Sequence, residues 1–231
     1  MKLLQASTLN ALMLGNFDRT ISVRDFLKEA DTGIGTYTGL DGEAIFMNGI
    51  AYNGTADGDV RIMKEEDGVA FGTVCRFDEN VPVQRFGKAN LETLKKQITP
   101  ANRNVFTMLK SEPLRFSKMH IRSCYPSEKP YPTLSEVACQ QKEFHLENIE
   151  GTVIALYCPD YVEGINLPGW HLHFLSSDKT RGGHILGLEC EEFDYKVNTL
   201  NEFDLILPEN PEFAELNLTE DLSAKTAAVE G

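Results

Sequence analysis

The chain has 231 residues, of which 42% are hydrophobic, so it can bury a core and form one large domain or two small ones. Its formal net charge of −13 argues against nucleic acid as a partner, because phosphate binding needs clustered lysine and arginine. An anionic substrate would have to be attracted locally, by a metal ion and by an arginine within the binding site.

The cysteines and the first residues predict a cytoplasmic protein. All five cysteines are scattered singly without a C-x-x-C pair, which favours reduced thiols over a disulfide framework. The first residues lack the continuous apolar region of a signal peptide, and no later stretch reaches membrane-spanning length. We therefore expect no membrane partner.

In chain order, the first part of the sequence predicts short helices and many strands. Helical patterns cover residues 7–14 (a helix or turn), 21–29 (with Ser22 as N-cap) and 91–97. Apolar or alternating patterns predict strands over residues 43–47, 50–52, 69–77, 105–109 and 115–122. Between the first two of these strands, Asn48-Gly49 is a strong signal for a β-hairpin. A further helix over residues 133–141 would have Thr133 as cap and Glu136 at the capping-box position.

The stretch from Gly169 to His184 contains three of the five histidines and follows a strand predicted over residues 147–158. Hydrophobic residues alternate with His171 and His173, so the period of two sends both imidazoles to one face of a strand. A polar segment that ends in Gly-Gly then predicts a turn, after which a second strand begins at His184. Three neutral nitrogen ligands with an open position is the arrangement of a catalytic zinc ion. The spacing therefore predicts a reactive metal centre on a hairpin.

The two other histidines are not expected to bind metal. His120 and His145 have no companions of this kind in the sequence, so solvated or core side chains are the expectation. In the hairpin, alternate histidines alone occur often by chance, and the third histidine across the glycine turn is what favours a metal.

The remaining pattern completes an α+β fold. Strands are predicted over residues 189–197 and 202–207, and residues 208–231 form an acidic, polar tail. Many strands with a few short helices favour two domains of mixed β-sheet over an alternating parallel fold. We place the N-terminal domain at residues 1–132, and the C-terminal domain, with the metal-binding hairpin and a returning tail, at residues 133–231. Each half has a hairpin near a glycine-rich turn, so a duplication is one interpretation.

Five segments occur in a characteristic order along nearly the whole chain. They are Gly33-Ile-Gly-Thr-Tyr-Thr-Gly-Leu-Asp-Gly-Glu43, Glu128-Lys-Pro-Tyr-Pro132, Thr152-Val-Ile-Ala-Leu-Tyr-Cys-Pro-Asp-Tyr161, Gly169-Trp-His-Leu-His-Phe174 and Gly182-Gly-His184. Together they resemble the bacterial α-acetolactate decarboxylase family. The chain departs from the family pattern at Arg19, Trp170 and Gly187, none of which is an expected ligand.

The resemblance implies decarboxylation of 2-acetolactate to acetoin by a zinc-dependent homodimer with a two-domain αβ fold. The residues it implies are the metal ligands His171, His173 and His184 and the active-site residues Glu43, Arg122 and Glu230. A Zn²⁺ ion with open positions can chelate the ketone and hydroxyl oxygens and stabilise the enediolate left by carbon dioxide. Arg122 can hold the substrate carboxylate in a bidentate pair. A glutamate near the metal can deliver the proton, and the choice between Glu43 and Glu230 stays open.

Other interpretations stay open on the residues alone. H-x-H with a glutamate and a later histidine would also supply iron ligands for a small non-haem oxygenase, which anaerobic activity and metal content would distinguish. The acidic chain could instead be a metal-stabilised binding module, which would unfold when the metal is stripped. Without the resemblance, Arg122 would be a surface charge and Glu230 part of a frayed tail.

Overall fold

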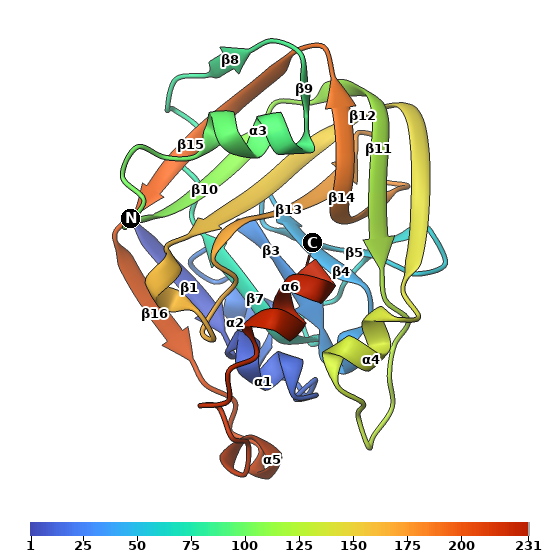
Figure 1. Ribbon diagram of the computed structural model, residues 1–231, viewed down its shortest axis with the longest axis vertical. Coiled ribbons are helices and arrows are strands. Elements are labelled where there is room, and N and C mark those ends of the chain that lie inside the picture. The colour runs from blue at the N-terminus through green and yellow to red at the C-terminus, as the bar shows by residue number, and fades with distance from the viewer. Residues whose placement is uncertain (231) are drawn as a thin grey trace.

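The computed structural model describes residues 1–230, and of Glu230 it describes the backbone alone. Within these residues the strands form two eight-stranded sheets, and the second sheet lies above the first in Figure 1. The helices that connect the strands are short. The predicted α+β class is confirmed as a mostly β fold with short helices.

The first sheet joins the beginning of the chain to a strand near its end. Its order is β16 (Glu202–Ile206), β1 (Lys2–Ala6), β7 (Gly68–Cys75), β3 (Thr32–Tyr37), β4 (Glu43–Met47), β5 (Ile50–Gly54) and β6 (Val60–Ile62), with β2 (Ile21–Ser22) paired to β7. The outermost strand β16 runs parallel to β1, and the other pairs are antiparallel.

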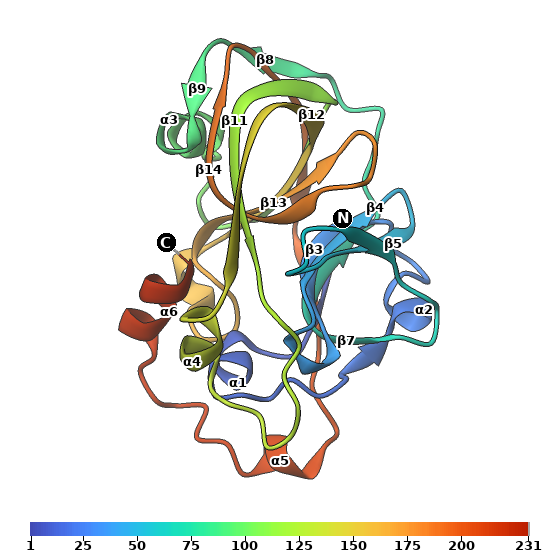
Figure 2. The same cartoon turned by 90° about the vertical axis from the view of Figure 1, so that its right-hand side faces the viewer.

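The second sheet curls back on itself. Its order is β11 (Leu114–Ser123), β14 (Gly182–Cys190), β13 (Gly169–Ser176), β12 (Lys142–Cys158), β10 (Phe106–Ser111), β15 (Phe193–Leu200) and β8 (Gln84–Phe86), with β9 (Ala89–Asn90) paired to β14. The long strand β12 pairs with β11 through its first part and with β13 and β10 through its second part. The sheet therefore closes around an apolar core, as Figure 2 shows from the side.

Short helices connect the strands and lie beside the sheets. They are α1 (Leu9–Met13), α2 (Val23–Phe26), α3 (Leu91–Ile98), α4 (Leu134–Ala138), α5 (Pro211–Ala214) and α6 (Ser223–Glu230), with 3₁₀ turns η1 (Thr38–Leu40) and η2 (Asp160–Val162). No helix within residues 1–230 is both long enough and apolar enough to span a membrane.

Several local predictions are confirmed. Asn48 and Gly49 join β4 to β5 with φ angles of 54° and 77°, as a tight hairpin turn requires. Ser22 caps α2 by accepting a hydrogen bond from the Asp25 N–H, although α2 is shorter than predicted. Glu136 accepts a hydrogen bond from the Thr133 N–H at 2.8 Å, the capping-box contact predicted for α4.

The predicted division at residues 132 and 133 does not coincide with the two sheets. It falls between β11 and β12, which pair with each other, and β10 also belongs to the second sheet. In addition, β16 returns from the last quarter of the chain to the first sheet. The sheets therefore divide the chain near residue 80 and again near residue 201, and not at the α4 helix.

The two sheets share an apolar core that brings β4 close to the histidine hairpin. Ile34 and Ile45 of the first sheet belong to the same buried cluster as Ile154 and Leu175 of the second. At Gly54 the backbones meet so closely that an added Cβ would lie 2.4 Å from the carbonyl oxygen of Gly182, the first residue of β14. Only glycine allows this approach, which places β4 and its first residue next to β13 and β14.

The predicted polar tail contains two helices that the sequence pattern did not indicate. Leu222 and Val229, at either end of α6, are buried against a cluster that includes Leu12 of α1 and Leu134 of α4. Figures 1 and 2 both show these three helices gathered on one side of the molecule. Leu222 and Val229 therefore hold the end of the tail against the body of the protein.

Candidate metal centre and active site

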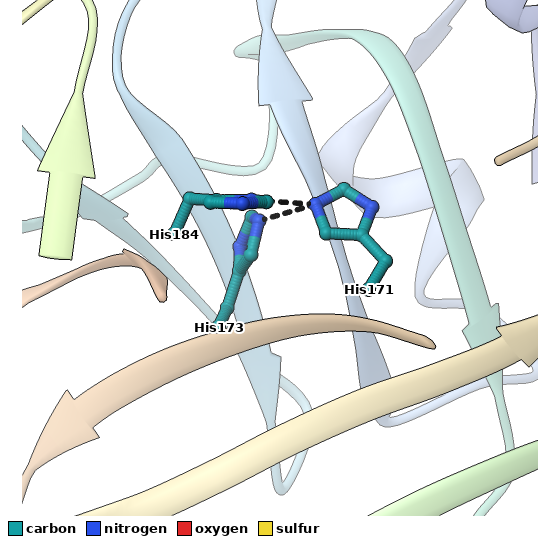
Figure 3. Close-up of side chains that lie close together, drawn as sticks. All are labelled: His171, His173 and His184. Carbon is teal, nitrogen blue, oxygen red and sulfur yellow. Dashed lines mark hydrogen bonds between the residues drawn. The ribbon is translucent and has the colours of Figure 1, made fainter. Parts of the chain in front are cut away.

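Three imidazoles converge between the two sheets, from positions that the hairpin register fixes. His171 and His173 lie two residues apart in β13, and His184 lies directly opposite His173 in β14. Nε2 of His171 is 2.9 Å from Nδ1 of His184 and 3.1 Å from Nε2 of His173 (Figure 3). The intervening hydrophobic residues Leu172 and Phe174 belong to the core of the second sheet. The predicted hairpin, with its imidazoles on one face, is confirmed.

The spacing of these nitrogens fits a shared ion. Nitrogen ligands at about 2.0–2.1 Å from one tetrahedral zinc ion are about 3.3 Å apart, and the observed separations lie within about 0.4 Å of this value. His173 Nδ1 lies 2.9 Å from the carbonyl oxygen of Ala44 in β4, to which it donates a hydrogen bond. This bond fixes the tautomer and leaves the lone pair of His173 Nε2 directed toward the other two imidazoles. The three histidines could therefore hold a metal ion.

Burial keeps the cluster neutral. The side chain of His173 is fully buried, and His184 is 3% exposed. Burial, with the positive charges of Arg122 and Lys95 as smaller causes, lowers the pKa of His171 to about 3. Burial likewise places the pKa of His184 well below its usual value, with Arg122 as the next cause. Neutral imidazoles are the form that binds a metal.

An ion pair between Arg122 and Glu43 borders the histidines and joins the two sheets. Arg122 lies in β11 opposite His184, and Glu43 is the first residue of β4. Arg122 Nη1 donates to Glu43 Oε1 at 2.9 Å, with side-chain exposures of only 4% and 9%. The other carboxylate oxygen of Glu43 lies 3.4 Å from His173 Nε2. Both predicted residues are thus brought to the histidine cluster.

A cavity opens onto this group and has one polar and one apolar side. Glu43, Arg122, His171 and Thr36 line the polar side. The apolar side consists of Leu9, Leu12, Leu40, Phe71, Leu134 and Leu167. Such a cavity suits a small ligand that carries both a charged group and methyl groups.

Sequence reasoning missed several contributors to this site. The apolar side comes mainly from α1, α4 and loops, which no motif connected to the histidines. The positive charge of Lys95 in α3 contributes to lowering the pKa values of His171 and His184. The sequence of α3 is that of an ordinary surface helix, so it did not indicate this role. The predicted residue Glu230 ends α6, but its side chain lies outside the described part of the structure.

His120 and His145, expected to be solvated or core side chains, are half-buried and exposed, but they have spatial neighbours that the sequence did not indicate. They lie opposite each other in β11 and β12, and their rings stack with centroids 4.0 Å apart. The sequence could not indicate this, because the pairing depends on the register of two strands. Neither residue belongs to the group formed by His171, His173 and His184.

Comparisons with known proteins agree with this fold and show the family. Residues 3–220 match the family model described as alpha-acetolactate decarboxylase. Two relatives named alpha-acetolactate decarboxylase are 34% identical over 220 residues (Brevibacillus brevis, covering 94% of this chain and 77% of the relative) and 36% identical over 226 residues (Methanosarcina mazei, covering 95% and 78%). The crystal structure of alpha-acetolactate decarboxylase from Bacillus subtilis superposes with a TM-score of 0.94 at 28% identity, covering 100% of both chains. The chain therefore belongs to the alpha-acetolactate decarboxylase family, a family of carboxy-lyases.

Proposed function

We propose that this protein decarboxylates 2-acetolactate to acetoin at the histidine cluster. The observation that carries the proposal is the position of the buried Arg122–Glu43 pair directly beside three converging neutral imidazoles. Family membership supplies the substrate class. The cavity lining matches the substrate in polarity, because acetolactate has a carboxylate for the polar residues and methyl groups for the apolar ones.

His171, His173 and His184 would hold the metal ion, for which we propose Zn²⁺. When bound, this ion supplies Lewis-acid stabilisation of the oxygen atoms on which negative charge develops as carbon dioxide leaves. Because all three ligands are neutral, they leave the ion its full positive charge. The hydrogen bond from His173 to the Ala44 carbonyl keeps one ligand in the required tautomer.

Arg122 is proposed to orient the substrate carboxylate. A guanidinium has five N–H donors in a rigid plane, so it can serve two carboxylates at once. Its bond to Glu43 fixes the plane of the guanidinium, and burial removes water that would compete for the substrate. Holding the carboxylate in one orientation favours cleavage of the bond between the carboxylate carbon and its neighbour.

Glu43 is proposed to deliver the proton that completes the reaction. After carbon dioxide departs, the resulting enediolate needs a proton on carbon to become acetoin. Glu43 lies within 3.4 Å of a metal-ligand nitrogen, so its carboxyl group is close to where the substrate would react. Glu230 is the second candidate. The residue before it, Val229, packs into a hydrophobic cluster that also lines the cavity.

One assay tests the whole proposal. Acetoin formation from 2-acetolactate should be lost when a chelator removes the metal, should return with added Zn²⁺, and should proceed equally well without oxygen. The chelated protein should keep its circular-dichroism spectrum, since both sheets have apolar cores of their own. No acetoin from the zinc-loaded protein would overturn the assignment, and a requirement for oxygen would favour an oxygenase.

The two glutamates can be told apart by matched substitutions. Glu230→Gln and Glu43→Gln should each be compared with Glu220→Gln, which changes an exposed tail residue paired with Lys225. A chain ending at Ala228 should keep its fold and its metal but lose most activity if Glu230 takes part. Wild-type turnover of that shortened chain would leave Glu43 as the proton donor. The homodimer stays a prediction, which sedimentation of the purified protein would check.

A further inference from the structure

A second group of potential metal ligands lies on the paired strands β11 and β12, and none of its members belongs to the histidine hairpin. His120 Nε2 is 2.8 Å from Glu143 Oε2, and the His120 ring stacks on the His145 ring. One ligand atom from each of the three residues lies within 4.8 Å of the other two. His120 is half-buried, whereas Glu143 and His145 are exposed to solvent. The group is therefore accessible to an ion from solution.

The strand register, and not a flexible loop, positions this group. β11 and β12 pair without a shift from Lys118 opposite Glu147 to Ser123 opposite Lys142. Within this ladder His120 lies opposite His145, and the next pair on the same face is Arg122 opposite Glu143. Neighbouring backbones thus hold the two imidazoles and the carboxylate together before any ion arrives.

The surroundings of the group attract cations. A surface cavity of about 390 Å³ adjoins His120 and His145, and its lining includes the three carboxylates of Glu92, Glu147 and Glu189 but only one lysine, Lys118. Lys118 lies 3.0 Å from Glu189, and Lys96 lies 2.7 Å from Glu92, so each lysine balances one carboxylate and the charge of Glu147 remains. The net charge of −13 adds to this local excess of negative charge.

We propose that His120, Glu143 and His145 form a second divalent-cation site, selective for a transition metal such as Zn²⁺ or Cu²⁺. Two imidazoles with one carboxylate suit these ions, whereas Mg²⁺ and Ca²⁺ prefer oxygen ligands alone. The exposed side chains of Glu143 and His145 can rotate to reduce the present separation to the roughly 3 Å between ligands of one ion. A bound ion clamps β11 to β12 next to Arg122, because its ligand Glu143 lies directly opposite Arg122.

Metal content measures this site directly. The wild-type protein and three variants are dialysed against micromolar Zn²⁺ and analysed for zinc per chain. His145→Ala and Glu143→Gln should each hold one ion fewer than the wild type under these conditions. Glu150→Gln is the matched control, because it makes the same change of charge on the same strand, at an exposed residue opposite Arg115 that does not line the cavity. Equal zinc content in the wild type and His145→Ala would overturn the proposal, whatever the hairpin site holds.

Thermal unfolding gives a second, independent readout. An ion that binds the folded protein, in which β11 and β12 are paired, and not the unfolded chain raises the temperature midpoint of unfolding as Zn²⁺ is added. The wild type and Glu150→Gln should show this rise at concentrations at least about tenfold below those needed for Glu143→Gln, because the loss of even an outer-shell partner of a metal costs 10–100-fold. Stabilisation of His145→Ala by Zn²⁺ as strong as that of the wild type would show that the group does not bind metal.

Discussion

Replacing Arg122 with lysine tests whether the planar guanidinium orients the substrate. The substitution keeps the positive charge but replaces a rigid fork of donors with one ammonium group. In the structure the Arg122 side chain is 4% exposed and donates to Glu43 at 2.9 Å, so water cannot substitute for a lost donor. A lysine would have to divide its single nitrogen between Glu43 and the substrate carboxylate.

The expected loss of kcat/KM in Arg122→Lys follows from the number of hydrogen bonds to charged groups that the lysine cannot make. A hydrogen bond to a charged group contributes about 1.5–3 kcal/mol, so the loss of one lowers kcat/KM by about 10- to 100-fold. The change should appear mainly in KM, with zinc content unchanged, because Arg122 is not a metal ligand. Steady-state acetoin formation and elemental analysis measure the two quantities.

A matched control lies on the same strand. Arg115 is an exposed residue of β11, so Arg115→Lys should have wild-type kinetics. An unchanged kcat/KM in Arg122→Lys, or an equal loss in Arg115→Lys, would refute the reasoning. Arg122→Met should behave differently from the lysine variant, since it removes the charge next to the buried Glu43 and should cost about 3–5 kcal/mol of stability in urea unfolding.

Four further predictions concern the cluster and the thiols. His173→Ala should lose the hairpin metal and acetoin formation together while the fold persists, which elemental analysis and circular dichroism check; wild-type activity would exclude this ligand. Glu43→Gln should keep its metal and slow turnover by about 10²–10⁴-fold, and unchanged kinetics would remove it from the mechanism. Burial lowers the pKa of His171 from 6.5 to about 3, so the folded, metal-free protein binds fewer protons than the unfolded chain between these values. Its urea midpoint should therefore fall as the pH drops through this range, and a flat profile would contradict the burial argument. Before unfolding, Ellman's reagent should react with the exposed Cys139 and not with buried thiols such as Cys75, whose pKa burial raises to about 12.

The features that sequence reasoning predicted correctly depend on neighbours along the chain. Alternation of histidines with hydrophobic residues determines the face of β13, and Asn48-Gly49 determines the turn between β4 and β5. Each of these signals needs only a few residues and one periodicity. The three histidines that could hold a metal ion could therefore be named from the hairpin alone.

The features that sequence reasoning missed depend on strand register and on packing between distant segments. The pairing of β11 with β12, which places His120 against His145, follows from how the second sheet closes. The approach of Glu43 to the histidines requires the close contact of Gly54 with Gly182, which joins two sheets. Helix α6 forms in a polar tail because Leu222 and Val229 find a buried surface on other helices. No local pattern carries this information.

The parallel pairing of β1 with β16 has a consequence for synthesis on the ribosome. Lys2 lies opposite Glu202, so β1 emerges 200 residues before its outer neighbour exists. During that interval β1 can pair with β7, but its other edge exposes unpaired N–H and C=O groups, which are a template for association with another strand. A nascent chain stalled before β16 would thus carry an open sheet edge. Chaperones that cover strand edges should bind such stalled chains and release them once residue 206 has been made.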